Sequence, residues 1–155
     1  MPDSSLIARP IFDSRWVIVC SPEYLESHPE PRCAEDLLGH NCLTYTYQES
    51  GTANWLMKRP GRNDIYELQV NGNLSANNAR AIRKAVIGGH GIAMVPRCMV
   101  YEDLQDGKLT EILAGHCGKV LGIYAVYPYT RNLPLKTRLL IEHIIGSYQN
   151  ISHYF

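Results

Sequence analysis

Short apolar runs alternate with polar, turn-forming segments along most of the chain. Ser5 to Ile11 and Arg15 to Cys20 are rich in β-branched residues and are separated by the turn-prone pair Asp13-Ser14, so the pattern predicts two strands. Ser21 follows directly, and serine is a preferred cap at the start of a helix. The chain is therefore expected to open with two strands and then turn into a short helix.

Shorter patterns predict the elements that follow. Ala34 to His40 has the composition of one helical turn closed by a glycine, and Cys42 to Tyr47 alternates like a strand. Gln48 to Asp64 is polar and turn-rich, so mostly irregular structure is expected there. Ile65 to Gly72 alternates again and predicts a strand with one face toward the core.

The stretch from Asn73 to Pro96 combines several patterns. Apolar residues recur at helical spacing after the polar segment Ser75 to Asn78, which predicts an amphipathic helix capped by one of these polar residues. Gly88 to Gly91 ends the helix, and Ile92 to Pro96 is typical of a short buried strand. With the strand at Ile65 to Gly72, this predicts a strand, helix, strand unit. The expected buried helix positions are Ala79, Ile82, Ala85 and Val86.

The C-terminal part continues the alternation. Val100 to Gly107 predicts a helix, Lys108 to Leu113 a strand and Val120 to Pro128 a longer strand. A final helix is expected with Asn132 as its cap and Pro134 in its first turn. Strands that alternate with helices predict an α/β architecture with a largely parallel sheet. The predicted buried stripe of the last helix is Ile141, Ile144, Ile145 and Tyr148.

Composition narrows the function classes. The 155 residues carry 15 Lys plus Arg and 15 Asp plus Glu, so the formal net charge is zero and the diffuse positive field that attracts nucleic acid is absent. Five cysteines without a CxxC pair argue against a disulfide framework and a zinc site. The sequence contains neither a signal-peptide core nor an apolar run of membrane-spanning length. We therefore expect a soluble cytoplasmic protein that binds no metal, no cofactor and no membrane.

The segment Ser75 to Asn78 is the first candidate for a ligand-binding site. The start of a helix presents unpaired N–H groups and the positive end of its dipole, which favour a carboxylate or phosphate. The same polar residues are also common helix caps with no ligand role. The local pattern leaves both interpretations open.

Catalytic patterns are weak elsewhere. Gly88 to Gly91 follows a helix instead of opening one, so it fits neither a dinucleotide-binding fingerprint nor a P-loop, and His90 within it is typical of a solvated loop residue. His116 and Cys117 are adjacent, but neighbours in sequence seldom point at each other. The sequence contains no GxSxG motif. These patterns give no support for an enzyme or for catalytic residues.

Six short stretches follow one another along the chain, from about Asp3 to Ile145. They are DSSLIARPI, VCSPEYLESHPEP, EDLLGHNCLTY, LSANNARAIRKAVIGGHGIAMVP, EDLQDGKLTEIL and YAVYPYTRNLPLKTRLLIEHI. In this order they resemble the effector-binding domain, or substrate-binding domain, of LysR-type transcriptional regulators. Each stretch is a weak match alone, but six in register make the resemblance specific.

The resemblance implies a fold like the type 2 periplasmic binding proteins, in which two α/β lobes are joined by two crossing strands and a small molecule binds in the cleft. Residues 1–43 and 124–155 would form a partial lobe I, and residues 44–123 would form lobe II. Leu43 to Thr46 and Tyr124 to Tyr127 would be the crossings. Family members carry a helix-turn-helix domain, a linker helix and further lobe I elements before the stretch DSSLIAR, so the first lobe is expected to be incomplete.

The resemblance also implies a site. The segment from residue 75 to residue 78 would face the cleft, and two further residues near the cleft would contact an anionic effector. The expected ligand-binding residues are Arg9, Thr44, Ser75, Ala76, Asn77 and Asn78.

We therefore expect a ligand-sensing regulatory domain that takes part in transcription regulation and has no catalytic activity. Its expected partners are a small anionic effector, a second copy in a homodimer and, only through the upstream helix-turn-helix domain, DNA. The alternatives are a stand-alone small-molecule-binding protein of the same fold and, less favoured, an enzyme with a Cys/His pair.

Overall fold

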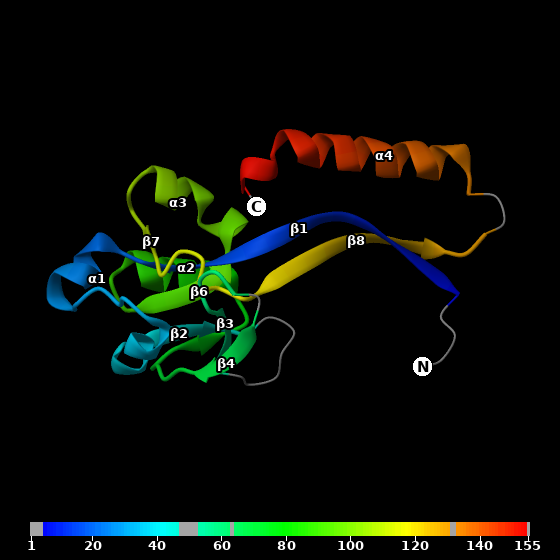
Figure 1. Ribbon diagram of the computed structural model, residues 1–155. Helices are drawn as coiled ribbons and strands as arrows, with labels where there is room; N and C mark the ends of the chain where they lie inside the picture. The colour runs from blue at the N-terminus through cyan, green and yellow to red at the C-terminus, as the bar shows by residue number, and fades with distance from the viewer. Residues whose placement is uncertain (1–4, 47–52, 63, 131–132, 155) are drawn as a thin grey trace. The chain divides into compact units, whose positions relative to one another are not determined.

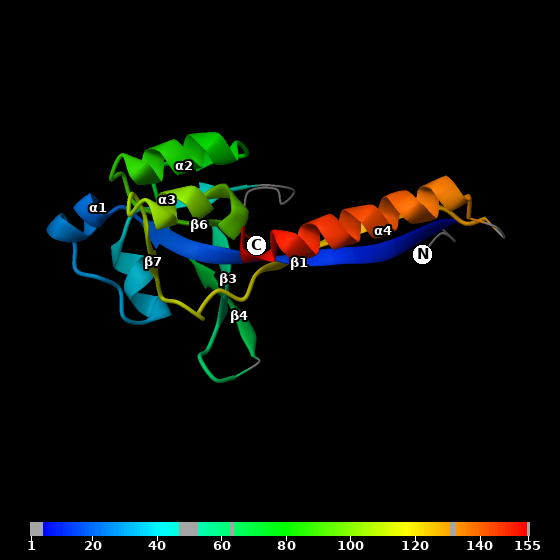
Figure 2. The same cartoon turned by 90° about the horizontal axis from the view of Figure 1, so that it is seen from above.

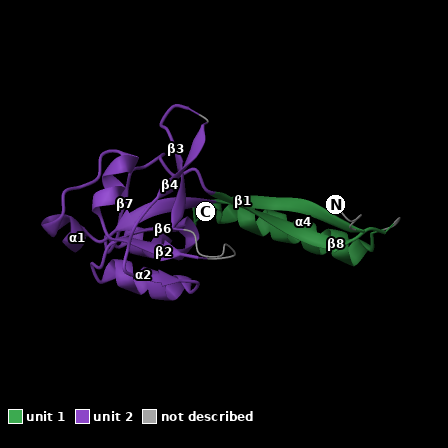
Figure 3. Ribbon diagram, turned by 90° about the horizontal axis from the view of Figure 1, so that it is seen from below, with its two compact units in different colours: residues 1–14, 120–155 green, residues 15–119 purple. Residues whose placement is uncertain are grey.

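The structure is a computed structural model that describes residues 5–46, 53–62, 64–130 and 133–154 (Figure 1). The chain divides into two compact units: unit 1 comprises residues 1–14 and 120–155, and unit 2 comprises residues 15–119 (Figure 3). The strands are β1 (Leu6–Cys20), β2 (Cys42–Tyr45), β3 (Asn54–Lys58), β4 (Ile65–Gln69), β5 (Ser75–Ala76), β6 (Ile92–Pro96), β7 (Thr110–Ile112) and β8 (Val120–Pro128). The α-helices are α1 (Pro22–Ser27), α2 (Ala79–Ile87), α3 (Tyr101–Gln105) and α4 (Leu135–Asn150), and the 3₁₀ turns are η1 (Ala34–Gly39), η2 (Arg97–Met99) and η3 (Ser152–Tyr154).

Unit 2 is built on a mixed sheet in the order β5-β2-β6-β1-β7. β2 runs parallel to β5 and β6, whereas β1 runs antiparallel to β6 and β7. The prediction of a largely parallel sheet was therefore wrong. A helical crossover imposes parallel pairing only on the strands that it connects, and β1 lies beside strands that come much later in the chain.

β1 is one continuous strand, not the two predicted strands with a turn at Asp13-Ser14. Exposure alternates through this point, because Asp13 and Arg15 are exposed whereas Ser14 and Trp16 are buried. An alternation without a break is that of an extended chain with one buried face. The burial of Ser14 and Trp16 thus outweighs the turn preference of the two polar residues.

The strand that precedes α2 in the sheet is β5, not the predicted strand at Ile65 to Gly72. β5 and β6 both run parallel to β2, so β5, α2 and β6 form the strand, helix, strand unit. β4 pairs instead with β3 in a separate antiparallel sheet. β3 lies in the segment that was expected to be irregular, and its Trp55 and Met57 are buried.

The core of unit 2 lies between the sheet and the helices that cover it, and Figure 2 shows α2 running along the sheet. Ile82 and Val86 of α2 are at most 1% exposed, and Ala85 is half-buried, so the predicted helix face is confirmed. Residues at alternate strand positions point to the same side, which places one row of each strand in this core. These core strand residues are Val17, Val19, Leu43, Ala93 and Val95.

Unit 1 contains the first part of β1, together with β8 and α4. β8 pairs with β1 and has the predicted bounds. α4 begins at Leu135, so Pro134 precedes the helix and does not lie in its first turn; the predicted cap Asn132 lies outside the described residues. In the predicted stripe only Ile141 is buried, and the half-buried members are Ile144, Ile145 and Tyr148.

The chain passes between the two units inside β1, between Ser14 and Arg15, and again between Lys119 and Val120. The lobe boundaries predicted from the sequence were 43/44 and 123/124. The predicted crossing at Leu43 to Thr46 lies within unit 2, where β2 pairs with β5 and β6. The assignment of lobes I and II stays a prediction.

Candidate functional site

The corner of unit 2, which we define as Ser75 to Asn78 with Thr44, is formed where β2 and β5 end and α2 begins. Thr44 is the register partner of Ser75 in the parallel pair β2-β5. The backbone N–H of Thr46 donates to the carbonyl oxygen of Ala76 over 3.0 Å. The fold thus brings five of the six predicted ligand residues together.

The side chain of Asn78 caps α2. Its Oδ1 accepts from the backbone N–H groups of Arg80, at 3.0 Å, and Ala81, at 3.4 Å. Of the two interpretations of this segment, the cap thus applies to Asn78, and two of the donors at the helix start already have a partner. Ser75 and Asn77 are exposed.

The other two predicted residues have different environments. Thr44 is only 8% exposed, and its hydroxyl donates to the carbonyl oxygen of Leu74 over 3.4 Å. Arg9 is half-buried on β1 and belongs to unit 1, whereas the corner belongs to unit 2. Its ligand role stays a prediction.

Beside the corner lies a depression that we call the tryptophan hollow. It is lined by Trp16, Thr46, Asn54, Trp55 and Lys119, among others, and it adjoins the corner through the bond between Thr46 and Ala76. Trp16 is 5% exposed, and its indole Nε1–H has no hydrogen-bond partner within the described part of the chain. The ammonium group of Lys119 lies 4.1 Å from the centre of the Trp16 ring.

Sequence patterns missed this hollow because its residues come from distant segments. Trp16 was predicted only as part of a strand, and Lys119 had no predicted role. A buried tryptophan N–H usually finds a partner, so an orphan donor is the feature that singles out the hollow, and only coordinates reveal it.

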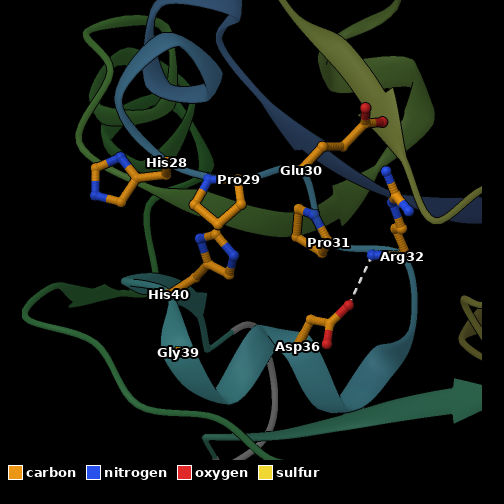
Figure 4. Close-up of a pocket in the computed structure, with 8 residues that line it drawn as sticks. All are labelled: His28, Pro29, Glu30, Pro31, Arg32, Asp36, Gly39 and His40. Atoms are coloured by element: carbon orange, nitrogen blue, oxygen red, sulfur yellow. Dashed lines mark hydrogen bonds between the residues drawn. The ribbon is translucent and has the colours of Figure 1, made fainter.

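A cavity of about 650 Å³ lies elsewhere in unit 2 and is lined in part by His28, Glu30, Arg32, Asp36 and His40 (Figure 4). We call it the histidine pocket. It comes from the loop after α1 and from η1, and among the described residues it shares no lining residue with the corner or the tryptophan hollow. Size alone therefore does not select the predicted site.

A hydrogen-bonded network lies beneath the histidine pocket. The hydroxyl of Tyr24 is 3.1 Å from Nδ1 of His40, and the Tyr24 ring stacks on His28 with centroids 4.1 Å apart. Nδ1 of His28 lies 3.1 Å from the Tyr24 carbonyl oxygen. Burial, and next the nearby His28, lower the pKa of His40, so the neutral ring is favoured there.

Three of the cysteines lie in environments that favour the thiol. Burial raises the pKa of Cys20 and of Cys42 to about 12, and that of Cys117 to about 11. Nδ1 of His116 lies 3.2 Å from the Leu113 carbonyl oxygen. Because a thiolate is the nucleophilic form, these environments give no support for a Cys/His catalytic pair.

The described residues give no support for a role of His90, for a metal site or for a membrane-spanning helix. The side chain of His90 is exposed, and its backbone carbonyl accepts from the amide of Asn41 over 2.6 Å. Across the described ranges, no group of three or more metal-ligating side chains is assembled. Within the same residues, no helix combines the length and the apolar character needed to cross a membrane.

Comparison with known proteins places this geometry in a family. The family model "LysR substrate binding domain" matches residues 2–149. The HTH-type transcriptional regulator CrgA of Neisseria meningitidis serogroup C is 32% identical over 151 residues, which cover 97% of this chain and 49% of the relative. The chain thus spans about half the length of the curated relatives that it matches.

Solved regulatory domains have the same fold. That of AphB from Vibrio vulnificus matches with a TM-score of 0.76 at 33% identity, over 95% of this chain and 71% of that chain. The regulatory domain of CrgA from Neisseria meningitidis matches with a TM-score of 0.75 at 28% identity, over the same two shares. The mixed α/β chain therefore has the type 2 periplasmic-binding-protein-like fold, as predicted. It belongs to the LysR substrate-binding domain family and is an effector-binding domain of the LysR type.

Proposed function

We propose that this domain senses a small anionic effector, and that unit 2 binds it at the corner and the adjoining tryptophan hollow. The corner and the tryptophan hollow are adjacent, and both present polar groups. Ser75 and Asn77 are exposed at the corner, and the hollow begins at Thr46, whose N–H is bonded to Ala76 of the corner. A ligand that bridges them would contact the end of β2 and the start of α2.

The observation that carries this proposal is the unpartnered Nε1–H of Trp16. A buried donor without an acceptor costs about 1–3 kcal/mol relative to a satisfied one. An acceptor atom of a ligand that enters the hollow would recover this loss. The indole would therefore favour a ligand with an oxygen atom at its leading edge.

The preference for an anion follows from the charges around the hollow. Lys119 supplies a positive charge beside the indole, and no carboxylate side chain is among the described lining residues. The positive end of the α2 dipole adds to the same field near the corner. A carboxylate would thus meet donors and a cation, whereas a cationic ligand would meet repulsion.

Tryptophan fluorescence can test the site directly, because the chain has two tryptophans and both line the hollow. Addition of small carboxylates, one at a time, is expected to give one that changes the emission with saturation and raises the melting temperature by mass action. Trp16→Phe removes the donor, leaves Trp55 as the probe and should weaken binding about tenfold.

Two further variants separate the hollow from general charge effects. Lys119→Met should weaken the same carboxylate, whereas Lys108→Met, which removes an exposed lysine of unit 2 that pairs with Asp106, should not. Equal effects of the two lysine variants, or full binding by Trp16→Phe, would reject the hollow as the site.

The corner can be tested separately. Asn77→Ala is expected to lose most of the thermal shift caused by the carboxylate, because Asn77 is exposed and does not cap α2. Asn71→Ala, another exposed asparagine of unit 2, is the matched control. An unchanged shift in the Asn77 variant would exclude the corner from the site.

Homodimerisation is the proposed partner interaction. Unit 1 exposes apolar side chains on both of its strands, since Leu6 is 53% and Val126 is 60% exposed, and exposed apolar patches are typical of interfaces. Light scattering should report a dimer that Val126→Lys weakens. A monomer at high concentration would reject this part of the proposal.

A further inference from the structure

The histidine pocket is a second polar cavity that the effector site does not use. Its walls come from residues 28–32 and from η1, and its volume of about 650 Å³ lies within the range of small-molecule sites. Figure 4 shows His28 and His40 toward one side of the pocket and Glu30 and Arg32 toward the other. The question is which hydrogen-bonding groups these side chains leave open.

His40 presents a donor. Tyr24 is 3% exposed, and its hydroxyl accepts from the backbone N–H of Asn41 over 3.3 Å. The one hydroxyl proton then needs an acceptor, and Nδ1 of His40 lies 3.1 Å away. With Nδ1 as the acceptor, the neutral ring carries its proton on Nε2. His40 is 9% exposed and lines the pocket, and no described group bonds to this Nε2.

His28 is fixed by its neighbours. Its Nδ1 lies 2.9 Å from the Ser27 hydroxyl and 3.1 Å from the Tyr24 carbonyl oxygen, so neighbouring groups already engage this nitrogen. Its ring stacks on Tyr24, with the two ring centres 4.1 Å apart.

The charged side chains that line the pocket differ in whether they already have hydrogen-bond or ion-pair partners. Oδ2 of Asp36 accepts from the backbone N–H groups of Arg32, at 2.8 Å, and Cys33, at 3.1 Å, and these bonds lower the pKa of Asp36. The guanidinium of Arg32 is exposed and forms no ion pair with a described carboxylate. Glu30 is thus the one lining carboxylate without a described hydrogen bond.

We infer that the histidine pocket is a second ligand site, which takes the oxyanion group of a small phosphate or carboxylate compound. His40 Nε2–H on one side of the pocket and the Arg32 guanidinium on the other are its donors, and Glu30 opposes it. This site is independent of the proposed effector site. The other titratable groups around the network are Tyr24, Cys33, Asp36 and Cys42.

The test uses sulfate and acetate as probes, with chloride at matched ionic strength as the blank, and follows histidine ring resonances by NMR in the full chain. Sulfate is expected to shift the rings of His28 and His40 with saturation and to leave exposed His90 unchanged. Saturation by acetate would identify a carboxylate group, and saturation by sulfate alone a phosphate-like group.

Substitutions at exposed positions test the pocket without disturbing the core of the fold. Arg32→Ala should lower sulfate affinity about tenfold, whereas Arg62→Ala, an exposed arginine elsewhere in unit 2, should not change it. Glu30→Gln should raise affinity about threefold because it removes a like charge, with Glu102→Gln as its control. Ring shifts that chloride reproduces, or equal effects of the two arginine variants, would overturn the inference.

Discussion

β1 passes through two environments that differ in how completely they bury apolar side chains. In unit 2, Val17, Ile18 and Val19 are at most 2% exposed, whereas Leu6 of the same strand in unit 1 is 53% exposed. The residue types are similar, but the neighbours differ, since β6, β7 and α2 surround the second half of β1. Apolar content therefore indicates that a strand is to be covered, but not which element covers it.

The helices repeat this contrast. Ile82 and Val86 of α2 are at most 1% exposed, whereas Leu135, Leu139 and Leu140 of α4 are each more than half exposed. Unit 2 thus has a closed core of its own, whereas unit 1 leaves large apolar side chains exposed. Variants in the two units should differ in the same way.

The largest expected difference concerns leucines. Leu43 is fully buried in the core of unit 2, so Leu43→Ala should lower the free energy of unfolding by about 2–5 kcal/mol. Leu139 is 54% exposed, and Leu139→Ala should change it by less than about 0.5 kcal/mol. Urea unfolding measures both values, and equal losses would break the comparison.

An ion pair tests burial in the same way. Asp103 is 1% exposed and accepts from Nη2 of Arg83 over 2.7 Å. Asp103→Asn should cost about 1–3 kcal/mol, below the range for fully buried pairs because Arg83 is partly exposed and keeps some hydration. Asp106→Asn, in a pair with Lys108 in which both side chains are exposed, should cost almost nothing by the same unfolding measurement.

A smaller effect is expected at the start of α2. Asn78→Ala removes the cap and should cost about 0.5–2 kcal/mol. Asn77→Ala leaves the cap intact and should not change the free energy of unfolding. If the two asparagine variants were equally destabilised, Asn78 would not be the cap that anchors this helix.

Local patterns predicted elements whose cause is local. Ser21 caps α1 through a bond to the backbone N–H of Tyr24, and α2 begins at the predicted residue. β5 was missed because a two-residue strand has no periodicity and exists only through its pairing with β2. The direction of β1 was missed for the same reason, since sheet partners are set by the whole fold.

The candidate sites also differ in whether local sequence could predict them. The corner was predicted because its residues are contiguous, apart from Thr44. The tryptophan hollow joins Trp16 to Lys119, and the histidine pocket depends on Tyr24, which was seen only as part of a helix. Spacing along the chain cannot predict contacts of this kind, because they arise when strands and loops from distant segments meet.

The smallest expected effect is the response of unit 2 to pH. Burial lowers the pKa of His40 below its ordinary value of about 6.5, so the unfolded chain takes up this proton first. The contribution of neutral His40 to stability is complete above about pH 6.5 and is lost as the pH falls through the lowered pKa of the folded state. His40→Asn keeps an acceptor for the Tyr24 hydroxyl and should flatten this part of the curve of unfolding free energy against pH. His143→Asn, at an exposed position of unit 1, should leave the curve unchanged, and a curve that His40→Asn does not alter would show that burial in unit 2 has no effect on this titration.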